Sequence, residues 1–399
     1  MIPMSKPQYD EKEFKALSDV VLSGWWTMGA ITEKLEIGFA AFCGRDWGIG
    51  VSSCSAALHL SLIMATRIFG KGKIITSPLT FCSTVNAIIH SGNIPVLADV
   101  NNSQCIDPIE VLEIIVNDND SYIPFAGILP IHFAGAPCDM GELISIAGRH
   151  DLFIVNDCAH AIETTLGQKR IGSFGLASCY SFNPVKNIAA PEMGMVVTDS
   201  EELRDGVRRL RLHGMDIDAK SRVNKPGQYD ICDLGYKYNC TDIEAAFALE
   251  QFNKLISNWK IRAAIVTEYI NVFSEFESSG LFKGHCPIDT SDPEKIHGLH
   301  LMTIWMNNRD KFILKMREEG VYCGIHYKPV HLHSYYKKYG WELGDFPVAE
   351  WIGEHTVSLP LGPGMTKGDF DKVVSSMEKV FKGGDYSLIK VPGKSKIGI

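Results

Sequence analysis

The fold class is decided by residues 47–77, WGIGVSSCSAALHLSLIMATRIFGKGKIITS. Two short apolar runs, 47–52 and 73–77, flank a longer segment of helical periodicity at 55–69, which predicts a strand, a helix and a second strand. The same alternation continues to about residue 156. Short apolar strands that alternate with helices form a mostly parallel sheet with helices on both faces, so we predict an α/β fold.

The chain is long enough for two domains. Its 399 residues exceed the size at which a single hydrophobic core stops growing. Helical patterns at 10–23 and 31–43 precede the alternating region, and a second α/β unit starts near residue 281. We therefore predict a large domain over 1–260, which includes an N-terminal arm, and a smaller C-terminal α/β domain with an extension over 261–399.

The composition argues against several other classes of protein. Lys and Arg number 39 against 47 Asp and Glu, and the resulting charge of −8 disfavours a nucleic-acid-binding protein. Eleven cysteines are scattered without a CxxC pair, which indicates free thiols in a reducing compartment and disfavours a structural zinc site. The N-terminus lacks the apolar segment of a secretory signal, and no apolar run is long enough to span a bilayer. We expect a cytoplasmic protein without metal, membrane or nucleic-acid partners.

Two short segments whose groups are suited to ligand binding each follow a predicted strand. Ser53, Cys54 and Ser55 open a helix, where free backbone N–H groups and the positive helix end form an anion site; a plain serine cap is the alternative. Asp157 follows the apolar strand LFIVN, at the sheet edge where such folds bind ligands, and a helix-capping role is equally compatible with the pattern.

A lysine completes this set. Lys186 lies in a turn after the predicted strand 177–182 and is flanked by apolar residues; desolvation lowers the pKa of such an amine and allows it to form a Schiff base. Most lysines are solvated surface residues, and Lys186 taken alone would be interpreted that way. Together with the anion site and Asp157, it indicates a pyridoxal 5'-phosphate (PLP) enzyme with a phosphate cup, a carboxylate for the pyridine nitrogen and a Schiff-base lysine.

Residues 241–278 form a long helical region in this interpretation. Thr241 and Asp242 are its expected cap, and small residues near its start permit close approach of another helix. Its apolar stripe is compatible with a core face or with a dimer interface.

Further short blocks run in order along nearly the whole chain. They are Gly24-Trp25, Thr27-x-Gly29, Thr80-Phe81, His132-Phe133-x-Gly135, Asp139-Met140, Arg211-x-His213-Gly214, Gly324-Ile325-His326-Tyr327, Ser358-Leu359-Pro360-Leu361 and Pro363-Gly364-Met365-Thr366. In these blocks, and in the order of the lysine and carboxylate motifs, the sequence resembles the fold-type I sugar aminotransferases of the DegT class, which are aspartate-aminotransferase-like PLP enzymes.

The resemblance implies roles for the matching positions. Lys186 would form the Schiff base and shuttle the proton, Asp157 would pair with the pyridine nitrogen, and Phe81 would stack on the ring. His160 would lie near the phenolic oxygen of the ring. Asn239 would reach the phosphate of a neighbouring subunit, so the active sites would be shared within a homodimer.

Two further groups of residues are implied to bind ligand. The phosphate would be held by Ser181 and by the backbone near Ser53, Cys54 and Ser55. The sugar side would be lined by Thr27, His326, Tyr327 and His331. Clustered histidines can instead cover a solvated turn, which is the alternative role for His331.

Departures from the family pattern concern the acceptor more than the chemistry. Pro191 and Met193 replace glycines in the turn after the lysine, and we expect this turn to survive with altered packing. Cys54 and Cys158 stand where glycine and alanine are usual. A dehydratase branch of the family carries histidine in place of the lysine, and Lys186 argues against that branch.

The expected reaction is a two-step, ping-pong transamination. L-glutamate would donate its amino group and leave as 2-oxoglutarate, and the amine would then add to a keto sugar. By family analogy this is a nucleotide-linked keto-deoxy sugar, of the kind used in lipopolysaccharide or O-antigen biosynthesis. Two alternatives stay open: amination of a free keto sugar or keto sugar acid, and a non-catalytic PLP-binding regulatory protein.

Overall fold

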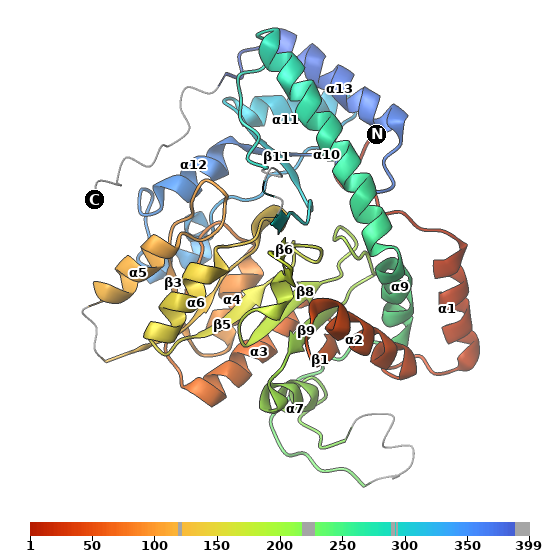
Figure 1. Cartoon of the computed structure of the whole chain (residues 1–399), viewed down its shortest axis with the longest axis vertical. Helices are drawn as coiled ribbons and strands as arrows, with labels where there is room; N and C mark the ends of the chain where they lie inside the picture. The colour runs from red at the N-terminus through yellow and green to blue at the C-terminus, as the bar shows by residue number, and fades with distance from the viewer. Residues whose placement is uncertain (119–121, 218–227, 289–291, 293, 388–399) are drawn as a thin grey trace.

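A mostly parallel sheet forms the centre of the molecule (Figure 1). The computed structural model describes residues 1–118, 122–217, 228–288, 292 and 294–387. Within them the sheet contains β1 (Trp47–Val51), β2 (Lys73–Thr76), β3 (Ile94–Leu97), β4 (Phe125–Leu129), β5 (Phe153–Asp157), β8 (Ala177–Ser181) and β9 (Gly194–Thr198). Their order is β1-β9-β8-β5-β4-β2-β3. Strands β3, β2, β4, β5 and β8 pair in parallel, whereas β9 pairs antiparallel with β8 and β1, so the predicted α/β fold is confirmed.

Helices cover both faces of this sheet (Figure 1). One face is covered by α3 (Cys54–Phe69) and α7 (Glu201–Leu210). The other is covered by α2 (Ala30–Cys43), α5 (Pro108–Val116), α6 (Met140–Arg149) and α9 (Asp242–Asn253). α4 (Cys82–His90) contributes side chains to both cores. Because side chains alternate along a strand, Ile154 of β5 packs in one core and Val155 in the other, which is why these strands are apolar throughout.

A third hydrophobic core involves the C-terminal part of the chain. It includes α10 (Leu255–Ser278), α11 (Arg309–Glu318), α13 (Lys367–Lys382) and the antiparallel pair β11 (Met302–Trp305) and β12 (Thr356–Leu359). Ile2 packs in the same core: its N–H donates to the carbonyl of Gly320 at 2.8 Å, and its carbonyl accepts from Tyr322 at 3.0 Å. The N-terminal residues therefore contact the C-terminal unit, and the division at residue 260 stays a prediction.

The remaining elements are short or peripheral. They are α1 (Glu11–Ser23), α12 (Pro347–His355), β6 (Thr165–Leu166), β7 (Lys169–Arg170), β10 (Lys295–Ile296) and 3₁₀ turns at Phe133–Gly135, Ile171–Ser173, Val330–Leu332 and Ser334–Tyr339. Residues 388–399 of the predicted C-terminal extension lie outside the described residues. Among the described helices, none is both long enough and apolar enough to cross a membrane.

The helical region 241–278 is two helices rather than one. α9 ends at Asn253 and α10 begins at Leu255, and Lys254 between them, with φ −95° and ψ −2°, is the C-cap of α9 and the N-cap of α10. The amine of Lys254 is held by Glu13 of α1 at 2.7 Å. The break therefore coincides with an ion pair between elements that are distant in sequence.

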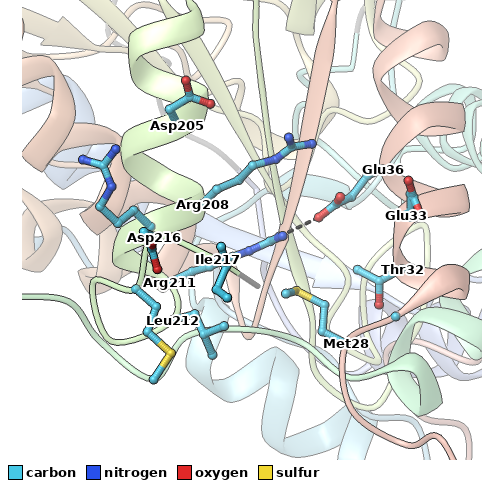
Figure 2. A pocket seen from close by; sticks show the side chains of 13 residues that line it. Met28, Thr32, Glu33, Glu36, Asp205, Arg208, Arg211, Leu212, Asp216 and Ile217 are labelled. Carbon is cyan, nitrogen blue, oxygen red and sulfur yellow. Dashed lines mark hydrogen bonds and ion pairs between the residues drawn. The ribbon is translucent and has the colours of Figure 1, made fainter. Parts of the chain in front are cut away.

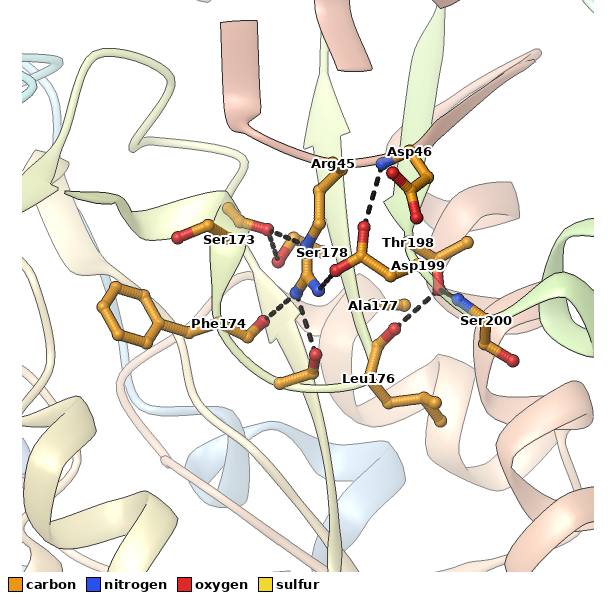
Figure 3. A network of polar contacts seen from close by, with 12 residues as sticks. Arg45, Asp46, Ser173, Phe174, Leu176, Ala177, Ser178, Thr198, Asp199 and Ser200 are labelled. Atoms are coloured by element: carbon orange, nitrogen blue, oxygen red, sulfur yellow. Dashed lines mark hydrogen bonds and ion pairs between the residues drawn. The ribbon is translucent and has the colours of Figure 1, made fainter. Parts of the chain in front are cut away.

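Arg45 joins the turn between α2 and β1 to the strands beside it (Figure 3). Its guanidinium donates to the carbonyl oxygens of Gly172 at 2.8 Å, Phe174 at 2.6 Å and Gly175 at 2.8 Å. It also pairs with Asp199, which follows β9, at 2.7 Å. These contacts hold the amino end of β8 and leave its carboxyl end free to carry other groups.

Asp242 caps a helix other than its own. Thr241 is the N-cap of α9, as expected from the sequence. The carboxylate of Asp242 then accepts hydrogen bonds from the backbone N–H groups of Gly29 at 2.8 Å, Ile31 at 3.2 Å and Thr32 at 3.0 Å, at the start of α2. Three donors that the helix itself leaves unpaired are thus satisfied by one buried carboxylate.

We expect Asp242→Ala to destabilise the protein by about 2–3 kcal/mol, because it leaves these donors at the start of α2 without acceptors. Calorimetry should show the loss as a melting temperature lower by a few degrees. Asp242→Asn is the matched control, because its amide oxygen still accepts from Gly29 and Thr32; its loss should be smaller. Equal melting temperatures for the wild type and Asp242→Ala would contradict this role.

Candidate active site

A cavity of about 320 Å³ lies where β5 and β8 end and α3 begins. It brings together most of the predicted site residues from five parts of the chain. These residues are Ser53, Cys54, Ser55, Phe81, Asp157, His160, Ser181, Lys186, His326 and Tyr327. The location follows from the fold, because the carboxyl ends of neighbouring parallel strands open at one edge of the sheet.

Asp157 presents a buried carboxylate to this cavity. One oxygen accepts from the hydroxyl of Thr84 at 2.8 Å, and the other accepts from the N–H of Ala159 at 3.1 Å. Burial raises the pKa of the carboxyl, while these two hydrogen bonds and the charge of Lys186 act against the rise. Among the described residues no cation lies at salt-bridge distance from it, so the carboxylate can bind a cationic N–H group of a ligand.

Lys186 lies in the turn between β8 and β9. Its backbone N–H donates to the carbonyl of Asn183 at 2.8 Å, and the side chain of Asn183 donates to Glu192 at 2.7 Å, which closes the turn. Met193, in place of glycine, is fully buried and accepts from the N–H of Phe182 at 2.8 Å through its carbonyl. The turn accommodates the Met193 side chain within the core.

The amine of Lys186 is desolvated although its side chain as a whole is only partly buried. Burial lowers the pKa of this amine to about 8, and the charge of Asp157 and the neighbouring Cys54 oppose the shift. A substantial fraction of the amine is therefore unprotonated near neutral pH, which is the form that attacks a carbonyl carbon.

The start of α3 forms the third wall of the cavity. Ser53 is the N-cap, and its hydroxyl accepts from the N–H of Ala56 at 3.1 Å. The same segment also lines the cavity, so the capping and anion-site interpretations of the sequence are compatible. A Cβ on Gly194 would lie 2.4 Å from the backbone of Ser53 and 2.6 Å from the nitrogen of Cys54, so only glycine allows β9 to pass this close.

Aromatic and imidazole side chains form the opposite side. The N–H of Ala134 donates to Nδ1 of His160 at 3.2 Å, and Nε2 of His160 lies 3.2 Å from the hydroxyl of Tyr327. Burial lowers the pKa of His160 well below its usual range, with Lys186 adding to the effect. The ring is therefore neutral, and the proton sits on Nε2, from which it is donated to Tyr327.

His300 also lines the cavity and was not predicted from the sequence. Its Nε2 lies 3.5 Å from the amine of Lys186, and its ring lies 4.4 Å from that of His160, centroid to centroid. The residue stands 114 positions after Lys186, at the start of an apolar segment that predicts a strand. No local signal separates it from a core histidine.

Three predicted residues lie away from this cavity wall in the single chain. Thr27 is exposed before α2. The side chain of Asn239 donates to the carbonyl of Cys240 at 2.9 Å, and its buried oxygen has no partner. His331 is buried, with Nε2 2.9 Å from Glu350 of α12 and its ring against Phe346. The hydrogen bond between His331 and Glu350 gives this buried imidazole a polar partner, and the ligand contacts of all three residues stay predictions.

A larger cavity of about 680 Å³ lies between α2 and α7 (Figure 2). Arg208 and Arg211 point across it toward α2, and Arg211 contacts Glu36 at 2.5 Å and the carbonyl of Gly50 at 2.6 Å. Its described lining includes Asp and Glu carboxylates and Arg guanidinium groups but no lysine, cysteine or histidine. The desolvated amine of Lys186 and the desolvated carboxylate of Asp157 both belong to the smaller cavity. Within the described residues no group of three His, Cys, Asp or Glu side chains is placed to bind a metal ion.

Comparison with known sequences connects this cavity to a family. The model of the DegT/DnrJ/EryC1/StrS aminotransferase family matches residues 7–378. The chain belongs to this family. As a DegT-family sugar aminotransferase it is an enzyme of a class whose members are PLP-dependent transaminases.

Relatives of this DegT-family enzyme match it along almost its whole length. The spore coat polysaccharide biosynthesis protein SpsC of Bacillus subtilis is 37% identical over 395 residues, 96% of this chain and 98% of SpsC. DesV of S. venezuelae, solved in complex with a ketimine intermediate, is 28% identical with a TM-score of 0.82 over 94% of this chain and 95% of that one. The putative sugar aminotransferase Spr1654 of Streptococcus pneumoniae is 25% identical in its PMP-form, with a TM-score of 0.85 over 96% of this chain and 100% of that one. Its PLP-form gives a TM-score of 0.84 over 96% and 99%.

The lowered pKa of Lys186 can be measured on the cofactor-free protein. We expect acetylation of Lys186 by acetic anhydride to rise with pH and to be half-maximal near pH 8, because only the unprotonated amine reacts. Peptide mass spectrometry measures it, and Lys34, exposed on α2, corrects for the pH dependence of the reagent. A midpoint near the ordinary lysine value of about 10.4 would show that the amine is solvated.

Proposed function

We propose that this enzyme is a PLP-dependent aminotransferase that moves the amino group of L-glutamate to a nucleotide-linked keto-deoxy sugar. The observation that carries the proposal is the common cavity of the Lys186 amine and the Asp157 carboxylate, each withdrawn from water, beside the N-terminus of α3. Lys186 supplies the nucleophile and the proton carrier, and Asp157 supplies the buried negative charge. The reaction proceeds in two half-reactions, with the donor leaving before the acceptor binds.

The cavity residues fit PLP. Asp157, which has no cationic side chain at salt-bridge distance among the described residues, suits a protonated ring nitrogen. The first N–H groups of α3 at Cys54 and Ser55, together with Ser181, suit a phosphate. Exposed Phe81 offers an aromatic face at the mouth of the cavity. When bound, PLP supplies a carbonyl for the amine and an electron sink for the carbon that loses its proton.

The residues of the chain orient and move protons around this group. Lys186, once displaced by the substrate amine, holds a basic nitrogen inside the cavity and can carry a proton between two adjacent atoms. The Nε2–H of His160 donates to the hydroxyl of Tyr327, which leaves the Tyr327 O–H to donate to a ligand oxygen that carries negative charge. Ser53, as helix cap, holds the N-terminus of α3 in place.

The acceptor is proposed from the relatives. SpsC is named for spore coat polysaccharide biosynthesis, and DesV and Spr1654 belong to the same family. These names support a sugar acceptor destined for a glycan, and a soluble cytoplasmic enzyme is consistent with that role. We further propose a homodimer in which Asn239 and Thr27, which lie outside the cavity of one chain, contribute to the site of the other.

Lys186→Ala tests the central assignment. We expect turnover to fall by about 1,000-fold or more, because the proton carrier and the covalent attachment point are lost together. The purified variant should also lack the visible absorbance of covalently attached cofactor. Lys169→Ala, at an exposed lysine of β7, is the matched control. Wild-type turnover by Lys186→Ala would contradict the proposed function.

A half-reaction experiment separates the three candidate functions. L-glutamate should convert the cofactor spectrum of the enzyme to that of the aminated form and release 2-oxoglutarate. A nucleotide-linked keto-deoxy sugar should then restore the original spectrum at least about ten times faster than a free keto sugar or keto sugar acid, because binding of the nucleotide contributes to catalysis. Faster recovery with a free sugar would favour the alternative acceptor. No spectral change with any amino donor would favour a regulatory protein.

A further inference from the structure

A buried ion pair lies just behind the cavity wall. Glu163 and Arg262 are both almost fully buried, and a guanidinium nitrogen of Arg262, on α10, is in direct contact with one carboxylate oxygen of Glu163. Neither side chain lines the cavity. A buried ion pair adds little net stability over apolar packing, so stability alone does not explain this one. The second carboxylate oxygen of Glu163 has a different partner.

That second oxygen fixes the orientation of an amide. The Nδ2 group of Asn187, next to Lys186 in the chain, donates to Glu163 at 2.6 Å and to the carbonyl of Gly298 at 2.8 Å. Both partners can only accept hydrogen bonds, so the NH₂ group must face them. The amide oxygen of Asn187 therefore points the other way, toward Nδ1 of His300 at 3.1 Å.

This orientation determines which nitrogen of His300 carries the proton. An amide oxygen only accepts, so Nδ1 of His300 must donate to Asn187. Burial lowers the pKa of His300 well below its usual range, with His160 and Lys186 adding to the effect, so the ring carries one proton only. Its Nε2 is then an unprotonated acceptor, 3.5 Å from the amine of Lys186.

The backbone holds the ring in place independently of these side chains. The N–H of His300 donates to the carbonyl of Ala134 at 3.0 Å, and that of Gly298 donates to the carbonyl of Gly135 at 2.8 Å. Ala134 also donates to Nδ1 of His160, so the two neighbouring imidazoles, which are tilted by 33°, take opposite tautomers. One faces the cavity as a donor and the other as an acceptor.

Within the described residues, His300 is the hydrogen-bond partner of the Lys186 amine. Within the described part of the chain, the other titratable groups near the amine make no hydrogen bond to it. They are Cys54, Asp157, His160 and His326. A neutral amine has two N–H bonds and one lone pair. When an N–H bond points at His300, the lone pair is free to point elsewhere, into the cavity.

We propose that Glu163, with Arg262 and Asn187, locks His300 in its Nδ1–H tautomer, and that His300 thereby accepts a hydrogen bond from the Lys186 amine and orients its lone pair toward the cavity. Glu163, Arg262 and Asn187 are positioning residues in this arrangement, and His300 contacts the reacting nitrogen. The inference rests on the proposed function, in which the Lys186 amine attacks the PLP carbonyl carbon. That attack forms a carbon–nitrogen double bond and releases one water.

The tautomer can be observed directly in the cofactor-free protein. In protein labelled with ¹⁵N-histidine, the His300 resonances, assigned by their loss in His300→Asn, should show a protonated Nδ1 and an unprotonated Nε2 at neutral pH. Asn187→Ala should shift His300 toward the Nε2–H tautomer, because the acceptor at Nδ1 is gone. A wild-type His300 with the proton on Nε2, or with both nitrogens protonated, would overturn the inference, as would an unchanged tautomer in Asn187→Ala.

A pair of His300 variants tests the orientation of the amine. When PLP is added to cofactor-free protein, the rate of covalent attachment to Lys186 should fall about five-fold in His300→Asn, which keeps the Nδ1-side donor but removes the acceptor. His300→Gln, whose amide oxygen can reach the position of Nε2, should recover most of the rate. Thermal melting of both variants shows whether they are folded.

Failure of the proposed function and failure of the role of His300 give different results. If PLP does not attach to wild-type Lys186 at all, the proposed function fails. If PLP attaches to the wild type at a normal rate and His300→Asn matches it, the function stands and the role of His300 is overturned. Equal slowing in His300→Asn and His300→Gln would also overturn it, because it would reflect packing and not the acceptor.

Discussion

The withdrawal of two opposite charges from water, at the carboxyl ends of β5 and β8, is the constraint on which the site depends. Burial raises the pKa of Asp157 and lowers that of Lys186 to about 8. Each group opposes the shift of the other through its charge. A lone buried charge would be costly, or its group would become neutral. Two opposite charges in one cavity limit the shift of each other's pKa, so each group can still ionise. The fold supplies this arrangement because parallel strands end at one edge.

The sequence predicts those parts of the site that follow local rules. Asp157 ends an apolar strand, Ser53 caps a helix that follows a strand, and Lys186 occupies a turn between strands; each position depends on neighbours within a few residues. The parallel pairing of the strands then brings the three together, and that pairing follows from the alternation of strands and helices. The resemblance to the DegT class adds residues such as His326 and Tyr327, which line the same cavity.

The remaining contacts join residues that no local pattern relates. His300 meets Lys186 across 114 positions, and Arg262 meets Glu163 across 99. In a single sequence each of these side chains is compatible with ordinary core packing. The break at Lys254 has the same origin: the helical periodicity continues through it, and the ion pair with Glu13 of α1 exists only in the folded chain. The contact of buried His331 with Glu350 is likewise formed only in the folded chain, and the sugar-side role of His331 stays a prediction.

The geometry of the cavity explains how Cys54, at the start of α3, and the net negative charge of the chain affect ligand binding. Burial raises the pKa of Cys54 well above its usual range, with the charge of Asp157 adding to it, so the thiol stays protonated and does not compete with Lys186 as a nucleophile. Where the family has glycine, Cys54 instead occupies volume beside the proposed phosphate site. The chain as a whole carries a charge of −8, which repels an anionic ligand. Such a ligand must therefore be held by short-range donors, and the N–H groups at the start of α3, a segment that lines the cavity, are donors of that kind.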